Sequence, residues 1–434
     1  MRISQRTFRQ HAAVCFRSQK SIPFLPFYCA SVVSCPLTND TSIRKEIEMK
    51  RTTLSMIAAA AFAAMPAAHA QSTVTLYGVI DTSITYVNHA QGSDNAWMLG
   101  NSSAGNLAGS RWGIKGSEDL GGGLKALFQL ENGFDPSTGR QGQGSRLFGR
   151  QAFVGLSSER YGTLTFGRQY DPLIDLVQGI TADNYLGSVF ATPGDVDNYD
   201  NSFRVDNAVK YTSPVYAGLQ FAAMYSFGGI AGSTGAAQSY SAAVSYGNGP
   251  FSVAGGYFHA TNSPASNGLR SGWTSSSDGT FDGPINSGYA TAHSIGIARV
   301  AAQYAAGPFT FGVGYSNAQY RRDASSVFGS NEHYNTGQGF VNYQATNALL
   351  VGVGYSYTRS GGDTSATYRQ VSAGADYSLS KRTDVYLTAA YQHASGQTGD
   401  GSGSAMAAQA SIGSYGYAGT SSQTMVNLGL RHRF

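Results

Sequence analysis

Segments in which apolar and polar residues alternate recur along the chain from residue 73 to its end. In the first of them, Val74, Leu76 and Ile80 share one face, and Thr75 and Asp81 share the other. A period of two is the pattern of a β-strand with one apolar and one polar face. We predict sixteen such strands, at 73–88, 110–116, 124–131, 150–157, 162–169, 207–212, 219–227, 238–247, 251–259, 295–306, 309–320, 333–345, 349–358, 368–378, 383–392 and 423–434.

The links between these predicted strands alternate in length. Links after the even-numbered strands are short and rich in turn formers, as at 248–250 and 307–308, and those after the odd-numbered strands are mostly long, as at 90–109 and 260–294. A soluble sandwich has no reason for this alternation, whereas a transmembrane barrel has short turns at one rim and long loops at the other. An even number of strands also lets the first pair with the last, which leaves no open edge. We therefore predict an all-β fold, a 16-stranded antiparallel transmembrane β-barrel.

The stretch 170–206 keeps neither a strict period of two nor a clean helical period. Structureless loops of about 37 residues are uncommon in compact domains, so an insert of this length is expected to have a function. We expect it to fold into the lumen of the barrel. There it would form a charged constriction of a water-filled pore, because it carries several aspartates, among them Asp171, Asp175, Asp183, Asp195 and Asp197.

Residues 1–70 differ in composition from the rest of the chain. They hold nine Lys or Arg against three acids, and subtracting this +6 from the formal +4 leaves about −2 for the remainder. Within them, 49–70 has a basic start, an apolar run and a small-residue ending, which is the pattern of a secretory signal peptide cleaved before Gln71. A transmembrane anchor is the weaker alternative, because a spanning helix needs roughly 18 to 20 apolar residues. We take 1–48 as a non-native upstream extension.

The remainder, 71–434, is expected to be a single barrel domain. Its net charge gives no ground for binding nucleic acid. Its histidines have no metal spacing, and it contains neither a Gly-x-Ser-x-Gly motif nor a phosphate-loop lysine. We therefore expect no enzyme activity, no cofactor and no metal site.

Six segments form an ordered set: TLYGVIDTSITY at 75–86, SRWGIKGSEDLGGGLKALFQLE at 110–131, GRQAFVGL at 149–156, FGRQYDP at 166–172, FRVDNAVKY at 203–211 and the ending LRHRF. Together they resemble the general, non-specific porins of Gram-negative outer membranes. The resemblance implies a homotrimer of sixteen-stranded barrels in the cell outer membrane, with short periplasmic turns, long extracellular loops and a third loop folded inward. Expected partners are outer-membrane lipid, lipopolysaccharide, and small hydrophilic solutes and ions.

The candidate constriction combines wall arginines with loop acids. Carried over residue by residue, the resemblance makes Arg111, Arg150 and Arg204 a basic wall that faces the loop. We favour Asp175 and Asp183 as the loop acids, although the chain lacks the Pro-Glu-Phe-Gly-Gly loop tip that would assign them. Solvated rim charges and helix or turn capping are the alternative uses of these side chains. Further candidate pore-lining residues are Asp81, Lys115, Glu131, Arg168 and Lys210.

These observations predict a passive diffusion channel for small hydrophilic solutes and ions. Weak anion selectivity is expected if the arginines outweigh the loop aspartates. A substrate-specific outer-membrane channel is one alternative, and a surface adhesin or structural barrel is another from a different class. The chain ends on Phe434, which lies on the apolar face of the last predicted strand. In the family that the chain resembles, a terminal aromatic is part of the assembly signal, and we assign that role to Phe434.

Overall fold

The structure is a computed structural model, and it describes residues 72–101, 104–266, 268, 270, 273, 280–414 and 416–434. The upstream extension, the signal peptide and the cleavage site before Gln71 lie outside these residues, so they stay predictions. None of the helices in the described ranges is long and apolar enough to cross a membrane.

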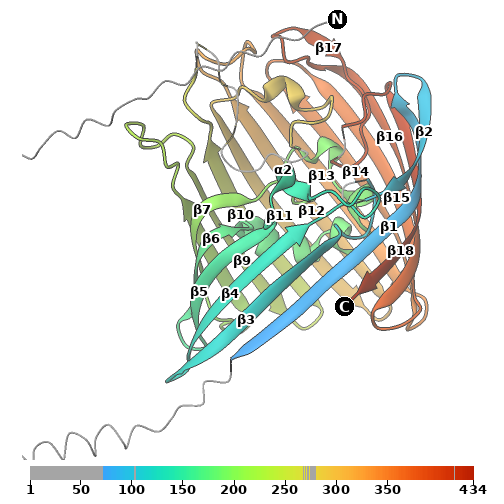
Figure 1. The fold of residues 1–434 in the computed structure, drawn as a ribbon. Helices are drawn as coiled ribbons and strands as arrows, with labels where there is room; N and C mark the ends of the chain where they lie inside the picture. The colour runs from blue at the N-terminus through green and yellow to red at the C-terminus, as the bar shows by residue number, and fades with distance from the viewer. Residues whose placement is uncertain are drawn as a thin grey trace, which may run out of the picture. The chain divides into compact units, whose positions relative to one another are not determined.

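Sixteen strands form a closed antiparallel barrel (Figure 1). Each strand pairs with its neighbours in chain order, and the last strand pairs with the first. The strands are β1 (Thr73–Gln91), β3 (Arg111–Gly121), β4 (Leu124–Gly133), β5 (Gln151–Ser158), β6 (Gly162–Gln169), β7 (Val205–Thr212), β8 (Leu219–Ser226), β9 (Ser239–Asn248), β10 (Phe251–Thr261), β11 (Ser294–Ala306), β12 (Phe309–Arg321), β13 (Glu332–Gln344), β14 (Leu349–Gly361), β15 (Ala366–Ser378), β16 (Thr383–Gly399) and β18 (Ser422–Arg433).

The predicted fold class and strand number are confirmed. The boundaries agree best where a strand meets a short turn, and β6 coincides with the predicted strand at 162–169. They agree least at the long loops, where β16 continues to Gly399 instead of ending at 392. The reason is that two short strands inside the long links, β2 (Asp94–Gly100) and β17 (Ala405–Ala407), pair with the ends of β1 and β16.

The wall of the barrel is apolar outside and polar inside. In β1 the side chains of Val74 and Leu76 are 67% and 61% exposed, whereas those of Asp81 and Thr85 are fully buried. A protein that shields its apolar side chains from water shows the reverse arrangement. An apolar outer face with a polar inner face is the arrangement that a lipid bilayer requires of a barrel wall.

The barrel closes where the C-terminus meets β1. The backbone N–H of Phe434 donates to the carbonyl of Gly78 at 3.1 Å, and its carbonyl accepts from the N–H of Gly78 at 3.0 Å. The Phe434 ring covers Gly78 so closely that a Cβ at this position would lie 2.4 Å from the ring. Closure therefore depends on an aromatic side chain at one position and on the lack of a side chain at the other.

Four charged side chains on the inner wall next to this closure form a group that we call the seam cluster, namely Asp376, Asp384, Arg431 and Arg433. Asp384 accepts hydrogen bonds from Arg431 and Arg433, both at 2.9 Å. Arg431 also donates to Asp376 at 3.1 Å. Two arginines and two aspartates thus neutralise one another and connect β15, β16 and β18.

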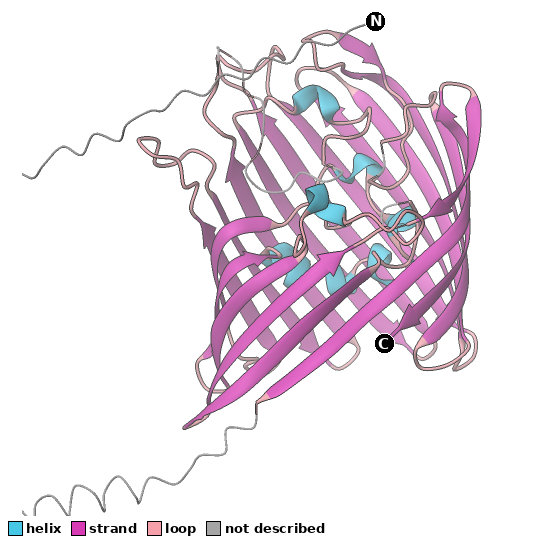
Figure 2. Cartoon of the chain, in the orientation of Figure 1, coloured by secondary structure: helices cyan, strands magenta, loops and turns pink. Residues whose placement is uncertain are grey.

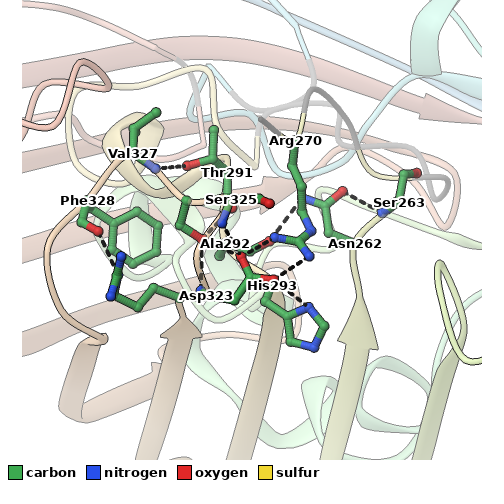
Figure 3. A network of polar contacts seen from close by, with 12 residues as sticks. Asn262, Ser263, Arg270, Thr291, Ala292, His293, Asp323, Ser325, Val327 and Phe328 are labelled. Atoms are coloured by element: carbon green, nitrogen blue, oxygen red, sulfur yellow. Dashed lines mark hydrogen bonds and ion pairs between the residues drawn. The ribbon is translucent and has the colours of Figure 1, made fainter. Parts of the chain in front are cut away.

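The long links on the other rim contact one another through side chains (Figure 3). Asp323, which follows β12, accepts two hydrogen bonds from the guanidinium of Arg270 in the link between β10 and β11. The Nδ1 atom of His293 lies 3.6 Å from the same carboxylate. The hydrogen bonds from Arg270 are the main cause of the low pKa of Asp323, about 2. At neutral pH the ionised carboxylate therefore joins two of the long links.

Candidate functional site

The central segment, which we define as 170–204, folds into short helical turns. They are α3 (Pro172–Leu176), η1 (Gln178–Ile180), α4 (Ala182–Leu186), η2 (Ser188–Phe190) and η3 (Pro193–Asp195). The first helix begins where the sequence favours it, because Pro172 suits the first helical position and the side chain of Asp171 accepts from the N–H of Leu173 at 2.8 Å. In such turns the backbone N–H and C=O groups form hydrogen bonds within the segment itself. This explains why the sequence of the central segment lacks the period of two that is typical of strands.

The central segment is held by side chains from distant parts of the wall. Tyr185 donates to Gln303 of β11 at 2.6 Å, and Tyr320 of β12 donates to the carbonyl of Val196 at 2.8 Å. Gln370 of β15 donates to the carbonyl of Val189 at 2.8 Å. The side chains that make these contacts lie on the polar face of the wall. In Figure 2 the short helices are seen within the outline of the barrel.

Arg299 of β11 is a further anchor of this segment. Its guanidinium lies over the ring of Tyr199, 3.6 Å from the centroid, and donates to the carbonyl of Asn198 at 3.1 Å. The residue is almost fully buried, so the contact is made out of reach of bulk solvent. A cation over an aromatic face is more strongly attractive when it is desolvated.

A polar cavity of about 700 Å³ lies between the central segment and the wall formed by β3, β4 and β5. It brings together the three arginines that the sequence analysis singled out, Arg111, Arg150 and Arg204, which we call the arginine cluster. Asp183, one of the two favoured loop acids, lines the same cavity, as does Glu131. Residues that are distant in the chain, from Asn101 to Gly416, therefore share one site.

The arginine cluster is organised around a single carboxylate and a tyrosine. Glu131 lies 2.8 Å from the Nε atom of Arg150 and 3.9 Å from that of Arg111. The hydroxyl of Tyr170 accepts from Arg150 at 2.8 Å and donates to Glu131 at 3.0 Å. The guanidinium of Arg204 lies 5.5 Å from the centroid of the Tyr170 ring. Two guanidinium groups, those of Arg111 and Arg150, thus share one carboxylate, and Arg204 joins them through the Tyr170 ring.

Arg204 is the least compensated member of the arginine cluster. It donates to the carbonyl of Ser202 at 3.3 Å, and its buried Nε atom has no hydrogen-bond partner among the described residues. Burial and the neighbouring Arg150 lower the pKa of Arg204 to about 10. The side chain is therefore still a cation at neutral pH.

The acids of the central segment are held differently. Asp183 accepts hydrogen bonds from Thr181 and Gln178, and Asp200 accepts one from Ser414 at 3.0 Å. Burial raises the pKa of Asp183. Burial, and then repulsion from Asp195 and Asp183, raises the pKa of Asp200 well above its ordinary value. Both carboxyls are therefore easier to protonate than solvated aspartates, and the effect is greater for Asp200.

The remaining candidate residues lie outside the cavity lining. Asp175 forms an ion pair with Lys210, so this favoured loop acid is placed away from the arginine cluster. Arg168 is paired with Asp206 in the same manner.

Asp81 and Lys115 are also accounted for by local contacts. The carboxylate of Asp81 accepts hydrogen bonds from Tyr386 at 2.6 Å, Asn106 at 3.0 Å and the N–H of Ala108 at 2.8 Å, so it anchors the first long link. The ammonium group of Lys115 lies 5.2 Å from the centroid of the Tyr77 ring.

Several residues of the cavity were not singled out from the sequence, among them Arg140, Tyr170 as a partner of the arginines, and Asp200. Arg140 lies in the irregular link between β4 and β5, where no period assigns a side chain to one face. Tyr170 and Asp200 belong to the non-periodic central segment. The only available signal was the motif FGRQYDP at 166–172, which contains Tyr170. No group of three His, Cys, Asp or Glu side chains in the described ranges is arranged to hold a metal ion.

A closed barrel with an apolar exterior and a charged polar cavity defines a transmembrane β-barrel with a polar interior. The family model of the Gram-negative porins matches residues 55–397. The chain therefore belongs to the Gram-negative porin family.

Two of the relatives are themselves outer membrane porins. The chain is 42% identical over 197 residues to an outer membrane porin protein of Bordetella pertussis, covering 41% of this chain and 48% of the relative. It is 36% identical over 211 residues to outer membrane porin protein 32 of Delftia acidovorans, covering 46% and 57%. The chain thus spans about half the length of these relatives. The major outer membrane protein P.IB of Neisseria gonorrhoeae is 28% identical over 76% of this chain and 90% of its own length.

Solved structures with the same fold include two barrels. The anion-selective porin from Comamonas acidovorans superposes with a TM-score of 0.62 and 24% identity, covering 84% of this chain and all of that one. The outer membrane protein OmpT of Vibrio cholerae superposes with a TM-score of 0.58 and 18% identity, covering 85% and 100%. At these identities the likeness shows the fold alone.

Proposed function

We propose that this protein is a passive diffusion channel of the outer membrane for small hydrophilic solutes and ions, and that it acts without enzymatic chemistry. The observation that carries the proposal is the cavity between the central segment and the arginine cluster, which is polar, charged and enclosed by a wall with an apolar exterior. Water and ions need such a polar path, since an apolar lining gates by excluding water. In this proposal the central segment narrows the lumen.

A general channel fits this lining better than a sugar-specific one. Among the described residues around the cavity, the aromatic side chains are Phe134 and Tyr170. Tyr170 is engaged by Glu131 and by the arginine cluster. A line of aromatic side chains along the path, which would support a specific sugar channel, is therefore not formed by these residues.

We infer a weak preference for anions. A formal count does not give this preference, because four arginines and five acids line the cavity. The preference follows from their ionisation: the guanidinium groups are charged at neutral pH, whereas burial raises the pKa of Asp183 and of Asp200. Permeating ions pass these groups well within the Debye length of about 10 Å at 0.1 M salt, so the fixed charges are only partly screened.

A homotrimer is part of the proposal. One of the structures with this fold is described as the trimer form of OmpT of Vibrio cholerae. Surrounding lipid and lipopolysaccharide are the partners that the apolar outer face implies.

Planar-bilayer recording of the purified, folded protein tests the proposal. We expect ohmic single-channel conductance, and in a salt gradient a reversal potential on the anion-selective side. Folded protein that inserts without ohmic conductance would refute the channel and favour an adhesin or structural barrel. Conductance that a particular solute blocks at low concentration would favour a substrate-specific channel instead.

A further inference from the structure

Cations gather on one sector of the outer face, close to the rim with the long links. They lie on four successive strands, and we call the group the basic belt: His333 of β13, Arg359 of β14, Arg369 of β15 and His393 of β16. Arg359 precedes the end of β14 by two residues, and Arg369 is the fourth residue of β15. Both positions adjoin the link from β14 to β15, which belongs to the long-link rim.

The register makes these residues neighbours. Arg369 lies directly opposite His393. Arg359 lies opposite Thr367 and Tyr357 opposite Arg369, so the two arginines are diagonal neighbours on adjacent strands. His333 stands in the same diagonal relation to Arg359. Strands lie about 4.8 Å apart, so four strands place these side chains in a band on the order of 15 Å wide.

The two arginines of the basic belt point outward, away from the cavity. In β14, Thr358 and Ser360 are buried, whereas Arg359 is exposed together with Tyr357. In β15, Arg369 is exposed on the face that also carries Val371, which is 54% exposed. The basic belt thus borders the apolar band that faces lipid.

No carboxylate compensates the basic belt. Ion pairs among the described residues involve neither Arg359 nor Arg369, and the guanidinium of Arg369 lies 5.8 Å from the centroid of the Tyr357 ring. Asp363, in the adjoining link, already accepts from the N–H groups of Gly329 and Ser330 at 2.7 and 2.9 Å. Glu332 is fully buried on the inner face.

Two further outward cations lie near this rim, Arg321 of β12 and His259 of β10, whereas β8 and β9 carry none. At the corresponding outward positions of β8, β9 and β10 the residues are aromatic: Tyr225, Tyr240 and Tyr257, with exposed fractions of 42%, 44% and 39%. Aromatic side chains suit the boundary between lipid tails and headgroups anywhere around a barrel. Unpaired arginines at the same level, by contrast, call for a local anion.

We propose that the basic belt binds the phosphate groups of an outer-leaflet lipid. A guanidinium forms paired, charge-assisted hydrogen bonds with phosphate, and a long arginine side chain can reach the headgroup while its carbon atoms stay on the apolar wall. A second copy of the chain is a poorer occupant, because β12–β16 present no outward carboxylate to such a partner among the described residues. The proposal uses the outer-membrane placement of the proposed function but not the conduction of ions.

The test compares the full protein with two double variants in detergent. Arg359→Gln with Arg369→Gln removes the arginines of the basic belt, whereas Lys381→Gln with Arg382→Gln removes two exposed cations from a short turn on the other rim. The probe is a fluorescently labelled diphosphoryl lipid A in mixed micelles, and the same lipid without phosphates is its control. Binding is followed by fluorescence anisotropy.

We expect the parent and the short-turn variant to bind the phosphorylated lipid alike, and the belt variant to bind it at least about tenfold more weakly, since each basic residue near an anionic surface is worth roughly 1 kcal/mol. The proposal would be overturned if the belt variant bound the phosphorylated lipid as tightly as the parent does. It would also be overturned if the parent bound the lipid without phosphates equally well. Displacement by millimolar inorganic phosphate would overturn it too, because it would indicate a site for the free anion. A changed oligomeric mass of the belt variant would assign the surface to subunit contact instead.

Conductance separates this proposal from the proposed function. The belt variant should conduct like the parent, which also shows that it is folded. If the parent binds phosphorylated lipid but does not conduct, the channel proposal fails and the lipid site stands. If both proteins conduct but bind the lipid equally, only the lipid site fails.

Discussion

The arginine cluster and the seam cluster place the same kinds of side chain on the same inner wall, but they balance charge differently. In the arginine cluster, Arg111 and Arg150 share the carboxylate of Glu131, and no carboxylate of the described residues lies within ion-pair distance of Arg204. In the seam cluster, two arginines meet two aspartates at 2.9 to 3.1 Å. One group carries a surplus of positive charge, and the other is neutral.

The difference separates structural charge from functional charge. A buried ion pair whose partners satisfy each other holds strands in register but exerts little field beyond its own atoms. A surplus of guanidinium groups beside a cavity is unfavourable for folding, yet it attracts anions that enter the cavity. Changes at the seam should therefore alter folding and leave selectivity unchanged, and changes at the arginine cluster should do the opposite.

The largest expected effect is at the seam, on deletion of Phe434. The deletion removes two backbone hydrogen bonds to Gly78 and the ring that covers it, which together are worth roughly 3 kcal/mol. We expect loss of most of the folded, heat-resistant protein in electrophoresis of outer-membrane fractions. Phe434→Ala keeps the backbone bonds and isolates the ring. A normal yield of folded protein from the deletion variant would show that Phe434 is not part of an assembly signal.

The next effect is on ion selectivity, from replacing Arg111, Arg150 and Arg204 together with glutamine. Loss of three positive charges beside the cavity should shift the reversal potential toward cations and change the permeability ratio several-fold. The control replaces three exposed cations at short turns, Lys125, Lys381 and Arg382, with glutamine. Its net charge changes equally, so an equal shift in both variants would show that the arginine cluster has no special position in the ion path.

A smaller effect, on stability alone, is expected from Asp384→Asn. The change leaves Arg431 and Arg433 without the carboxylate that each contacts at 2.9 Å, and we expect a loss of about 2 kcal/mol. Urea unfolding from lipid vesicles measures it, with reversal potentials recorded in parallel. A changed reversal potential with unchanged stability would contradict the contrast between the two clusters.

The smallest effect is a pH dependence of selectivity. Burial and neighbouring carboxylates raise the pKa of Asp200, so its carboxyl is neutral below that pKa and ionises as the pH rises through it. The added negative charge should reduce the anion preference gradually toward alkaline pH. Asp200→Asn should show at every pH the reversal potential that the parent shows at acidic pH, so its reversal potential should depend less on pH. A pH dependence that persists in Asp200→Asn would point to another carboxyl, with Asp183 the first to examine.

The wall of the barrel could be predicted from the sequence because its physics is local and periodic. Alternation in 73–88 assigned Asp81 and Thr85 to the polar face, and both are buried there. Strands β2 and β17 escaped prediction because they are short and lie in Gly-, Ser- and Asn-rich links. No period-two pattern is long enough there to be recognised.

The cavity could be predicted only in part. The strand positions of Arg111 and Glu131 follow from alternation, and the resemblance supplied Arg150 and Arg204. The central segment has no period, so the choice of Asp175 and Asp183 among its aspartates could not rest on alternation. Asp175 is paired with Lys210, whereas Asp183 lines the cavity. Which aspartate lines the cavity depends on how the central segment contacts strands such as β11 and β15, which are more than 100 residues away in the chain.

The pairing of β1 with β18 bears on the order in which the molecule forms. The side chains of Thr85 and Asn427 are hydrogen-bonded at 2.6 Å across 342 positions of sequence, and closing so long a loop costs about 5 kcal/mol of chain entropy. Contacts of this separation form slowly, and the edge of β1 that faces β18 is made first and paired last. Until β18 arrives, the part of β1 from Val79 to Asn88 presents an unpaired edge. During biogenesis this edge needs shielding from other chains, so the step that limits assembly is the meeting of the two ends.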